Sequence, residues 1–405
     1  MIYREVLHSE HLGIHAMSPF SSYNSSPRNV MFSSHVGQRL VIEGCDEEII
    51  QTGVSRELGK YSFSVTMPVN GNIIKVIEKY PKTASINSLP FNPETIVIYE
   101  NDETKEIDYI RIPYYNSLSQ FFGFKYDIKQ EAVDLIRHGN FIPKGTVFAD
   151  SPSIKENGGY AYGVNLNTAF MSLSSVSNDG MAIARDVLDK LKFKVYETRV
   201  IQFGTNCFPL NLHGSKYHYK PFPEIGDKIR DDGILAMLRD YDPDTVPVNF
   251  DLYSTMEPDM MFDVPTYVRG GGGRVIDIEV IGNNNPNKNL PEAMREQVVK
   301  YQQAYLRFCK EIIATDKKIR ETRKKSYGST DVKLSNRLHN LITECLAITN
   351  YNEEKYDQRL LLQHKKSSTD EYRVKFVIEY TITPDLGYKL TDTSGGLPYE
   401  SITLY

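Results

Sequence analysis

Apolar and polar positions alternate along several short segments between residues 60 and 120, which is the pattern of half-buried strands. Turn-forming sequences such as NGN and ENDET separate these segments. The predicted strands are YSFSVTMPV, NIIKVIEKY, TIVIYEN and IDYIRIPYY. This part of the chain therefore predicts a sheet of short strands.

Helical spacing predicts two short helices after this sheet. The first covers residues 127–138, with Gly139 as its C-cap. The second covers Met181–Leu191, where apolar residues share one face. Strand and loop patterns fill the rest of 141–204, and residues 205–268 read as a loop-rich subdomain.

The clearest helical pattern lies between residues 291 and 349. Two apolar stripes recur at helical spacing: Val298, Tyr305, Phe308 and Ile312, then Leu334, Leu338, Leu341 and Cys345. Between them lies the basic run KKIRETRKK, residues 317–325, followed by the turn SYGST. These features predict an antiparallel helical hairpin with a charged tip. The basic run is either a solvated helix end or a phosphate contact.

Two further strands are predicted in the second half of the chain. RVIDIEVI follows the glycine run Gly270–Gly273, and RVKFVIEYTIT spans Arg373–Thr383. Because strands outnumber helices, the predicted fold class is α+β, mainly β.

Composition narrows the function classes. The 405-residue chain is 40% hydrophobic and carries a net charge of −5, so any phosphate binding must be local rather than due to bulk positive charge. The four cysteines form no CxxC or CxxH pair, which argues against a zinc site and favours a reducing cytoplasm. The sequence also shows no signal peptide and no apolar stretch long enough to span a membrane.

One segment, SPFSSYNSSPRNVMFSSHVGQRLVIEG, is poor in charge, and its first cation is Arg28 behind Pro27. A guanidinium presents a planar fork of donors that suits phosphate oxygens. The alternative is an arginine that caps a helix C-terminus or pairs with a surface carboxylate.

This segment resembles the fork region of the second-largest, β-type subunit of multisubunit RNA polymerases, because NSSPRN is followed by Gln38. Five further segments resemble motifs of the same family in the same order. They are IPKGTVFADSPS, GYAYGVNLNTAF with the later SNDG, EIGDKIRDDGILAML, GGRVIDIEVI and GYKLTDTSGG. The resemblance implies an RNA polymerase β-type core with part of a double-psi β-barrel, a flap-like subdomain and a helical hairpin.

The resemblance also implies roles for individual residues. Arg28 would face the triphosphate of the incoming nucleotide, and Gln38, expected in a loop, would lie near the RNA–DNA hybrid. Asp179 would lie close to the second, nucleotide-borne Mg²⁺, directly or through water, with Asn178 in the place of the family's glutamate. An ordinary turn is the alternative for this Asn-Asp-Gly string. Lys389 would bind the RNA 3′-end phosphates, whereas Leu397 stands where the family has a second lysine.

The same resemblance implies an order of regions along the chain. The expected division is a fork-like segment (1–60), a small β-rich subdomain with a helix (61–140), the first part of the barrel core (141–235), a flap-like region (236–290), the helical hairpin (291–370) and the second part of the barrel with Lys389 (371–405).

The family's catalytic Asp triad and its permanent Mg²⁺ belong to the largest, β′-type subunit, so the resemblance implies partner chains. The expected partners are other β-type and β′-type fragments, the DNA template, the RNA product and nucleoside triphosphates, with a promoter-specificity factor at the flap-like region and no membrane. Split subunits of this kind are typical of giant bacteriophages, which implies the host cytoplasm or the virion as location.

Two other functions compete with this interpretation. A degenerate polymerase-like scaffold or regulator would explain the loss of the second lysine and of the glutamate before Asp179. A small-molecule α/β enzyme lacks support, because the sequence contains no phosphate loop, nucleophile elbow or dinucleotide fingerprint.

Overall fold

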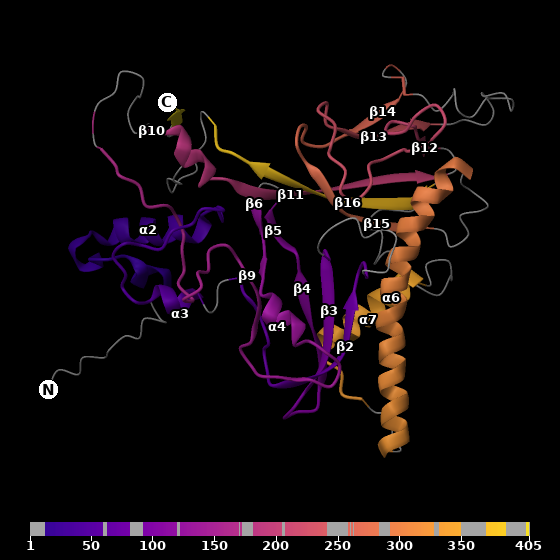
Figure 1. The fold of residues 1–405 in the computed structure, drawn as a ribbon, viewed down its shortest axis with the longest axis horizontal. Helices are drawn as coiled ribbons and strands as arrows, with labels where there is room; N and C mark the ends of the chain where they lie inside the picture. The colour runs from indigo at the N-terminus through magenta and orange to yellow at the C-terminus, as the bar shows by residue number, and fades with distance from the viewer. Residues whose placement is uncertain are drawn as a thin grey trace.

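The structure is a computed structural model that describes residues 13–59, 63–81, 92–119, 122–169, 171, 181–204, 207–240, 258–259, 261, 263–282, 292–327, 332–349, 370–385 and 402–404. It is a mixed α+β fold made mainly of strands (Figure 1). The largest sheet curls into half of a barrel. The α+β, mainly β class predicted from the sequence is confirmed at this level.

The largest sheet has eight strands, six of them in the order β14-β13-β12-β11-β16-β15, and β6 joins β5 to β11. β11 and β16 pair antiparallel from Phe193 opposite Ile382 to Phe203 opposite Tyr372, so they form the spine of the sheet. The strands are β5 (Tyr115–Ser119), β6 (Phe122–Lys125), β11 (Phe193–Gly204), β12 (Cys207–Pro209), β13 (Ile234–Asp240), β14 (Val264–Tyr267), β15 (Arg274–Gly282) and β16 (Asp370–Ile382).

A second, four-stranded antiparallel sheet has the order β4-β3-β2-β8. Both of its faces are covered: Val97 and Ile110 point into one core, whereas Ile96 and Ile98 point into another. Successive residues of a strand face opposite sides, which explains why an almost continuous apolar sequence forms β3. The strands are β2 (Gly71–Glu78), β3 (Glu94–Asn101), β4 (Ile107–Pro113) and β8 (Phe141–Ile142).

The long helix α6 (Glu292–Tyr327) joins the two sheets. Val298 and Ala304, in its first half, pack into the core of the eight-stranded sheet. Phe308 and Ile312, further along, pack into the core between the four-stranded sheet and α7 (Asn336–Thr349). Figure 1 shows α6 running along the side of both sheets. The predicted pair of helices is confirmed, and the basic run 317–325 lies within α6.

The remaining elements are small. At the N-terminal side, two 3₁₀ turns precede a 13-residue helix and a single helical turn: η1 (Gly13–Met17), η2 (Ser21–Tyr23), α2 (Ser26–Gln38) and α3 (Ser55–Gly59). A three-stranded sheet, β1-β9-β7, consists of β1 (Val65–Thr66), β7 (Asp127–Ile128) and β9 (Val147–Asp150). A two-stranded parallel sheet joins β10 (Met181–Ile183) to β17 (Ile402–Leu404).

Several local predictions differ from the structure. In the described part of YSFSVTMPV, the strand is confined to β1, which pairs with β9 in the separate three-stranded sheet. The helix expected over 127–138 is confined to α4 (Gln130–Asp134), and its C-cap is Leu135 rather than the predicted Gly139. The helix expected over Met181–Leu191 is wrong: the segment begins as strand β10 and continues as the 3₁₀ helix η3 (Arg185–Asp189). Gln38, expected in a loop, ends helix α2.

Candidate functional site

The structure describes two of the five predicted site residues. Arg28 and Gln38 lie at opposite ends of helix α2. Asn178, Asp179 and Lys389 lie outside the described residues.

The local sequence explains why α2 begins just before Arg28. Ser25 has the extended backbone of an N-cap, and its carbonyl accepts hydrogen bonds from the N–H groups of Arg28 and Asn29, each at 3.1 Å. Pro27 occupies the first turn, where its fixed φ fits the helix and its missing N–H costs nothing. Arg28 is therefore held in the first turn of a helix, close to the positive end of the helix dipole.

The side chain of Arg28 is exposed, and its Nη1 donates to Met31 Sδ at 3.4 Å. Residues 13–42 contain no Asp or Glu, and in the described part of the chain Arg28 forms no ion pair. The alternative of a helix C-cap is wrong, because Arg28 lies in the first turn. A guanidinium next to a helix N-terminus, without a carboxylate, is an environment that favours an anion.

Exposed apolar side chains lie on the same segment as Arg28. Phe20 is 65% exposed and Tyr23 is 90% exposed. The side-chain amide of Asn29 donates to the Ser21 carbonyl at 2.8 Å and ties this part of the chain to the start of α2. Exposed aromatic rings beside a cation can stack on nucleobases while the cation contacts phosphate.

At its other end, α2 leads into a contact with two more of the motif-like segments. Arg39, directly after Gln38, donates from Nη2 to Ser153 Oγ at 3.1 Å, and its guanidinium lies 4.5 Å from the ring centre of Tyr160. Burial lowers the pKa of Arg39, opposed by Tyr160 and Cys45. Arg39 thus connects the fork-like segment to ADSPS and to GYAYG.

Apolar packing strengthens this connection. Val36 of α2 shares a small core with Met17 and Tyr160. Phe32 meets Tyr162 edge-on, with ring centres 6.2 Å apart. The fork-like segment and the GYAYG segment, more than a hundred residues apart in sequence, are therefore neighbours.

The chain after α2 also reaches the start of β11. The N–H of Glu43 donates to the Lys192 carbonyl at 2.7 Å, and the N–H of Gly44 donates to the Lys190 carbonyl at 3.0 Å. A Cβ at Gly44 would lie 2.7 Å from Lys190 Cα, so this close approach requires glycine. On the other side, the N–H of Asp46 donates to the Gly163 carbonyl at 2.7 Å.

Two further contacts lie within motif-like segments or next to them in the sequence. Strand β10, which begins just after the SNDG sequence, pairs in parallel with β17, which follows the Lys389 segment at the end of the chain. In the EIGDKIR segment, the N–H groups of Gly226 and Ile229 donate to the carbonyls of Val275 and Gly273, each at 2.7 Å. Among the described residues, the fork-like segment thus contacts the ADSPS and GYAYG segments, and the EIGDKIR segment contacts GGRVIDIEVI.

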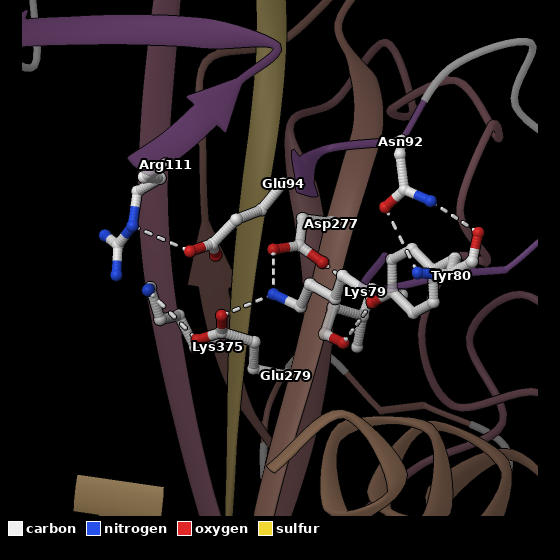
Figure 2. A network of polar contacts seen from close by, with 9 residues as sticks. Lys79, Tyr80, Asn92, Glu94, Arg111, Asp277, Glu279 and Lys375 are labelled. Carbon is white, nitrogen blue, oxygen red and sulfur yellow. Dashed lines mark hydrogen bonds and ion pairs between the residues drawn. The ribbon is translucent and has the colours of Figure 1, made fainter. Parts of the chain in front are cut away.

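A buried ion-pair network, which the sequence analysis missed, joins the two large sheets (Figure 2). Lys79, directly after β2, is 1% exposed, and its ammonium lies 2.5 Å from both Asp277 Oδ2 and Glu279 Oε1 of β15. The Tyr80 hydroxyl donates to Asp277 Oδ1 at 2.7 Å. Lys375 of β16 binds the second oxygen of Glu279 at 3.0 Å.

The charges of this network stabilise one another. Burial alone would lower the pKa of Lys79, but Asp277 and Glu279 outweigh burial and raise this pKa well above its ordinary value. Burial would raise the pKa of Glu279, but Lys79 and Lys375 outweigh it and lower the pKa to about 2. Lys79 and Glu279 are therefore charged at neutral pH, and their depth inside the protein makes the network a structural joint rather than a substrate site.

The sequence RVIDIEVI could have indicated this network, because Asp277 and Glu279 alternate with apolar residues in it. Two carboxylates separated by one residue lie on the same face of a strand, and an otherwise apolar strand buries carboxylates only when they are paired. The partner, Lys79, lies 198 positions from Asp277 and carries no comparable signal.

A second feature missed by the sequence analysis is the string Asp240-Tyr241-Asp242-Pro243-Asp244, which has Asp-x-Asp-x-Asp spacing. Asp240 is an exposed residue that ends β13, opposite Cys207, and residues 241–250 lie outside the described residues. Figure 1 shows β13 and α2 on opposite sides of the molecule. The described end of this string therefore lies far from the segment that carries Arg28.

Among the residues that the structure describes, no group of three or more His, Cys, Asp or Glu side chains is arranged to hold a metal ion. Within the same residues, no helix combines the length and the apolar character that crossing a membrane requires.

Comparisons with known proteins give no family for this chain. No protein-family model matches it, and no curated protein sequence is significantly similar to it. The polymerase β-type assignment therefore stays a prediction made from the motifs.

Proposed function

We propose that the chain is a β-type subunit fragment of a multisubunit DNA-directed RNA polymerase, which supplies contacts to nucleotide and RNA phosphates. In this proposal the catalytic Asp triad and the permanent Mg²⁺ belong to a β′-type partner. The finer fold, with part of a double-psi β-barrel and a flap-like subdomain, belongs to the same proposal. Six motif-like segments in family order are its sequence support.

The observation that carries the proposal is the exposed position of Arg28 without a described carboxylate partner. Its guanidinium is exposed in the first turn of α2, within residues 13–42, which contain no Asp or Glu, and exposed Tyr23 lies in the same stretch. A cation in this setting binds a phosphate without first breaking an ion pair. The adjoining contacts of Arg39 with Ser153 and Tyr160 support the proposal further, because they join three of the motif-like segments.

Each predicted residue has a proposed role. Arg28 contacts the triphosphate, and Gln38, exposed at the end of α2, contacts the RNA backbone or a base edge. Lys389 contacts the RNA 3′-end phosphates, and Asp179, with Asn178, lies near the nucleotide-borne Mg²⁺. Such groups accelerate phosphoryl transfer because charge spreads over the phosphate oxygens in the transition state.

The proposed assembly contains further β-type and β′-type fragments, the DNA template, RNA and nucleoside triphosphates, with a promoter-specificity factor at the flap-like region. A split-subunit polymerase of a giant bacteriophage, acting in the host cytoplasm or carried in the virion, fits this composition. The Asp-x-Asp-x-Asp string that begins at Asp240 bears on which chain holds the catalytic metal, because its spacing matches that of a catalytic Asp triad.

The second candidate function is a polymerase-like scaffold or regulator without a catalytic contribution. Leu397 in the place of a lysine and Asn178 in the place of a glutamate favour it. The test is to assemble the chain with its β-type and β′-type partners and to measure RNA synthesis by the Arg28→Ala and Lys389→Ala variants. If the chain is an active subunit, the complexes with Arg28→Ala or Lys389→Ala should assemble but elongate RNA much more slowly. If the chain is a scaffold, elongation should be unchanged in both variants.

A further inference from the structure

A groove of about 750 Å³ lies between the second half of α6 and the four-stranded sheet. Ile74 of β2 and Ile319 of α6, both partly buried against the core beneath, contribute to its floor. Exposed Ala314 contributes a small side chain from α6. The groove therefore presents an apolar floor with room for side chains of another molecule.

The charges at the groove are unbalanced. Its two carboxylates already have partners: Glu311 pairs with Lys75 at 3.0 Å, and Glu100 pairs with Arg323 at 2.6 Å. Lys318 also lines the groove and is exposed, and it pairs with no carboxylate of the described chain. The unpaired charge at the groove is therefore positive.

The same excess continues along the end of α6. Residues 317–325 contain six Lys or Arg side chains and one acidic residue, Glu321. Arg320 pairs with Asp316 within the helix, whereas exposed Lys317, Lys324 and Lys325 form no ion pair with the described residues. A partner that crosses the groove would meet this positive helix end next to the apolar floor.

We propose that this groove binds an acidic amphipathic segment of a partner protein. Apolar side chains of the segment would cover Ile74 and Ile319, and its carboxylates would face Lys318 and the basic end of α6. An amphipathic helix that lays its apolar face into a groove is a recurring mode of peptide recognition. This binding site is independent of the nucleotide contacts proposed for Arg28.

The groove lining favours a protein segment over nucleic acid. Among the described residues that line it there is no Phe, Tyr or Trp, so these residues offer nucleobases no ring on which to stack. The isoleucines and Ala314 instead offer an aliphatic surface, which suits leucine-like side chains.

The experiment measures binding of a labelled peptide of about 18 residues, with Leu on one helical face and Glu on the other, to the full chain by fluorescence anisotropy. Binding should weaken about tenfold or more in Ala314→Gln, which fills the floor with a long uncharged polar side chain, and in Lys318→Glu, which reverses the charge. Lys310→Glu is the matched control, because Lys310 is an exposed lysine of the same helix outside the groove lining, and it should leave the affinity unchanged.

Two further probes separate the outcomes. A peptide with Lys in the place of Glu should bind far more weakly, and an oligothymidylate of about 20 nucleotides should bind without sensitivity to Ala314→Gln. The proposal is overturned if the Glu peptide does not bind, if its affinity is equal in all three variants, or if the oligonucleotide rather than the peptide responds to the groove variants.

Discussion

The Lys79 ammonium lies 2.5 Å from Asp277 Oδ2, across 198 positions of the chain. Lys79 follows the last residue of β2 in the four-stranded sheet, and Asp277 belongs to β15 in the eight-stranded sheet. Tyr305 of α6 covers the ammonium, with its ring centre at 5.3 Å. The contact therefore fixes how the two sheets and the helix that joins them sit together.

Replacing Lys79 should destabilise the fold strongly. Lys79→Met leaves Asp277 and Glu279 buried without their main cation, and breaking a buried ion pair in this way costs about 3–5 kcal/mol. Urea unfolding measures the loss. Lys75→Met, on the same strand, removes the exposed pair with Glu311 and should cost less than about 1 kcal/mol. Equal losses of unfolding free energy in the two variants would mean that the buried network stabilises the fold no more than the exposed ion pair does.

The stability should also depend on pH through Glu279. Its pKa is lowered to about 2 in the folded chain, below the value of about 4.3 expected in the unfolded chain. The folded state therefore binds this proton less readily, so the stabilisation is complete above about pH 5 and is lost as the pH falls toward 2. The raised pKa of Lys79 contributes no loss in this acidic range.

The measurement is the urea midpoint between about pH 6 and pH 3. Glu279→Gln cannot titrate, so its midpoint should fall less steeply with decreasing pH than that of the wild type. The same steepness in both proteins would show that other carboxylates control the acid sensitivity.

Removing the exposed ring of Tyr23 should weaken binding to single-stranded RNA. Stacking on one base contributes about 1–3 kcal/mol, so Tyr23→Ala should raise the Kd by about tenfold at low salt, measured by fluorescence anisotropy. Tyr217→Ala is the matched control, because Tyr217 is 87% exposed, close to the 90% of Tyr23, and lies elsewhere in the fold. An equal change of Kd in both variants would show that the fork-like segment does not contribute specifically to RNA binding.

The Asp-x-Asp-x-Asp string gives a test of the division of labour between subunits. If a partner chain carries the catalytic triad, Asp242→Asn and Asp244→Asn should change RNA synthesis by the assembled complex by less than about threefold. Loss of RNA synthesis in both variants, in complexes that still assemble, would mean that the catalytic metal site belongs to this chain.

Regular alternation and helical spacing predicted the regular part of the fold. The segments NIIKVIEKY, TIVIYEN and RVIDIEVI became β2, β3 and β15, and the stripe from Val298 to Ile312 became part of α6. These elements bury one or two continuous faces, so local sequence and tertiary packing favour the same structure.

The missed elements depend on distant contacts or lack a strong apolar stripe. Helix α2 contains three Ser, a Pro and a Gly among its 13 residues, and Val36 is its buried residue, so its pattern resembles that of a loop. Met181–Ile183 forms a strand because it pairs with Ile402–Leu404, and no local pattern reveals this pairing.

The candidate site was predictable only through the resemblance. Composition and spacing indicated that Arg28 was unusual, but its first-turn position and its lack of a described carboxylate partner required the structure. The contact of Arg39 with Tyr160 joins segments that no local pattern connects.

The most direct test of the proposed function is the nucleotide KM of the assembled polymerase with Arg28→Ala. Arg56→Ala serves as the control, since Arg56 is also an exposed arginine on a short helix of the same region, α3. The proposal predicts that Arg28→Ala raises the KM for nucleoside triphosphates by about tenfold or more, that Arg28→Lys lies between it and the wild type, and that Arg56→Ala is unchanged. An unchanged KM in Arg28→Ala, in a complex that assembles and transcribes, would contradict the proposal.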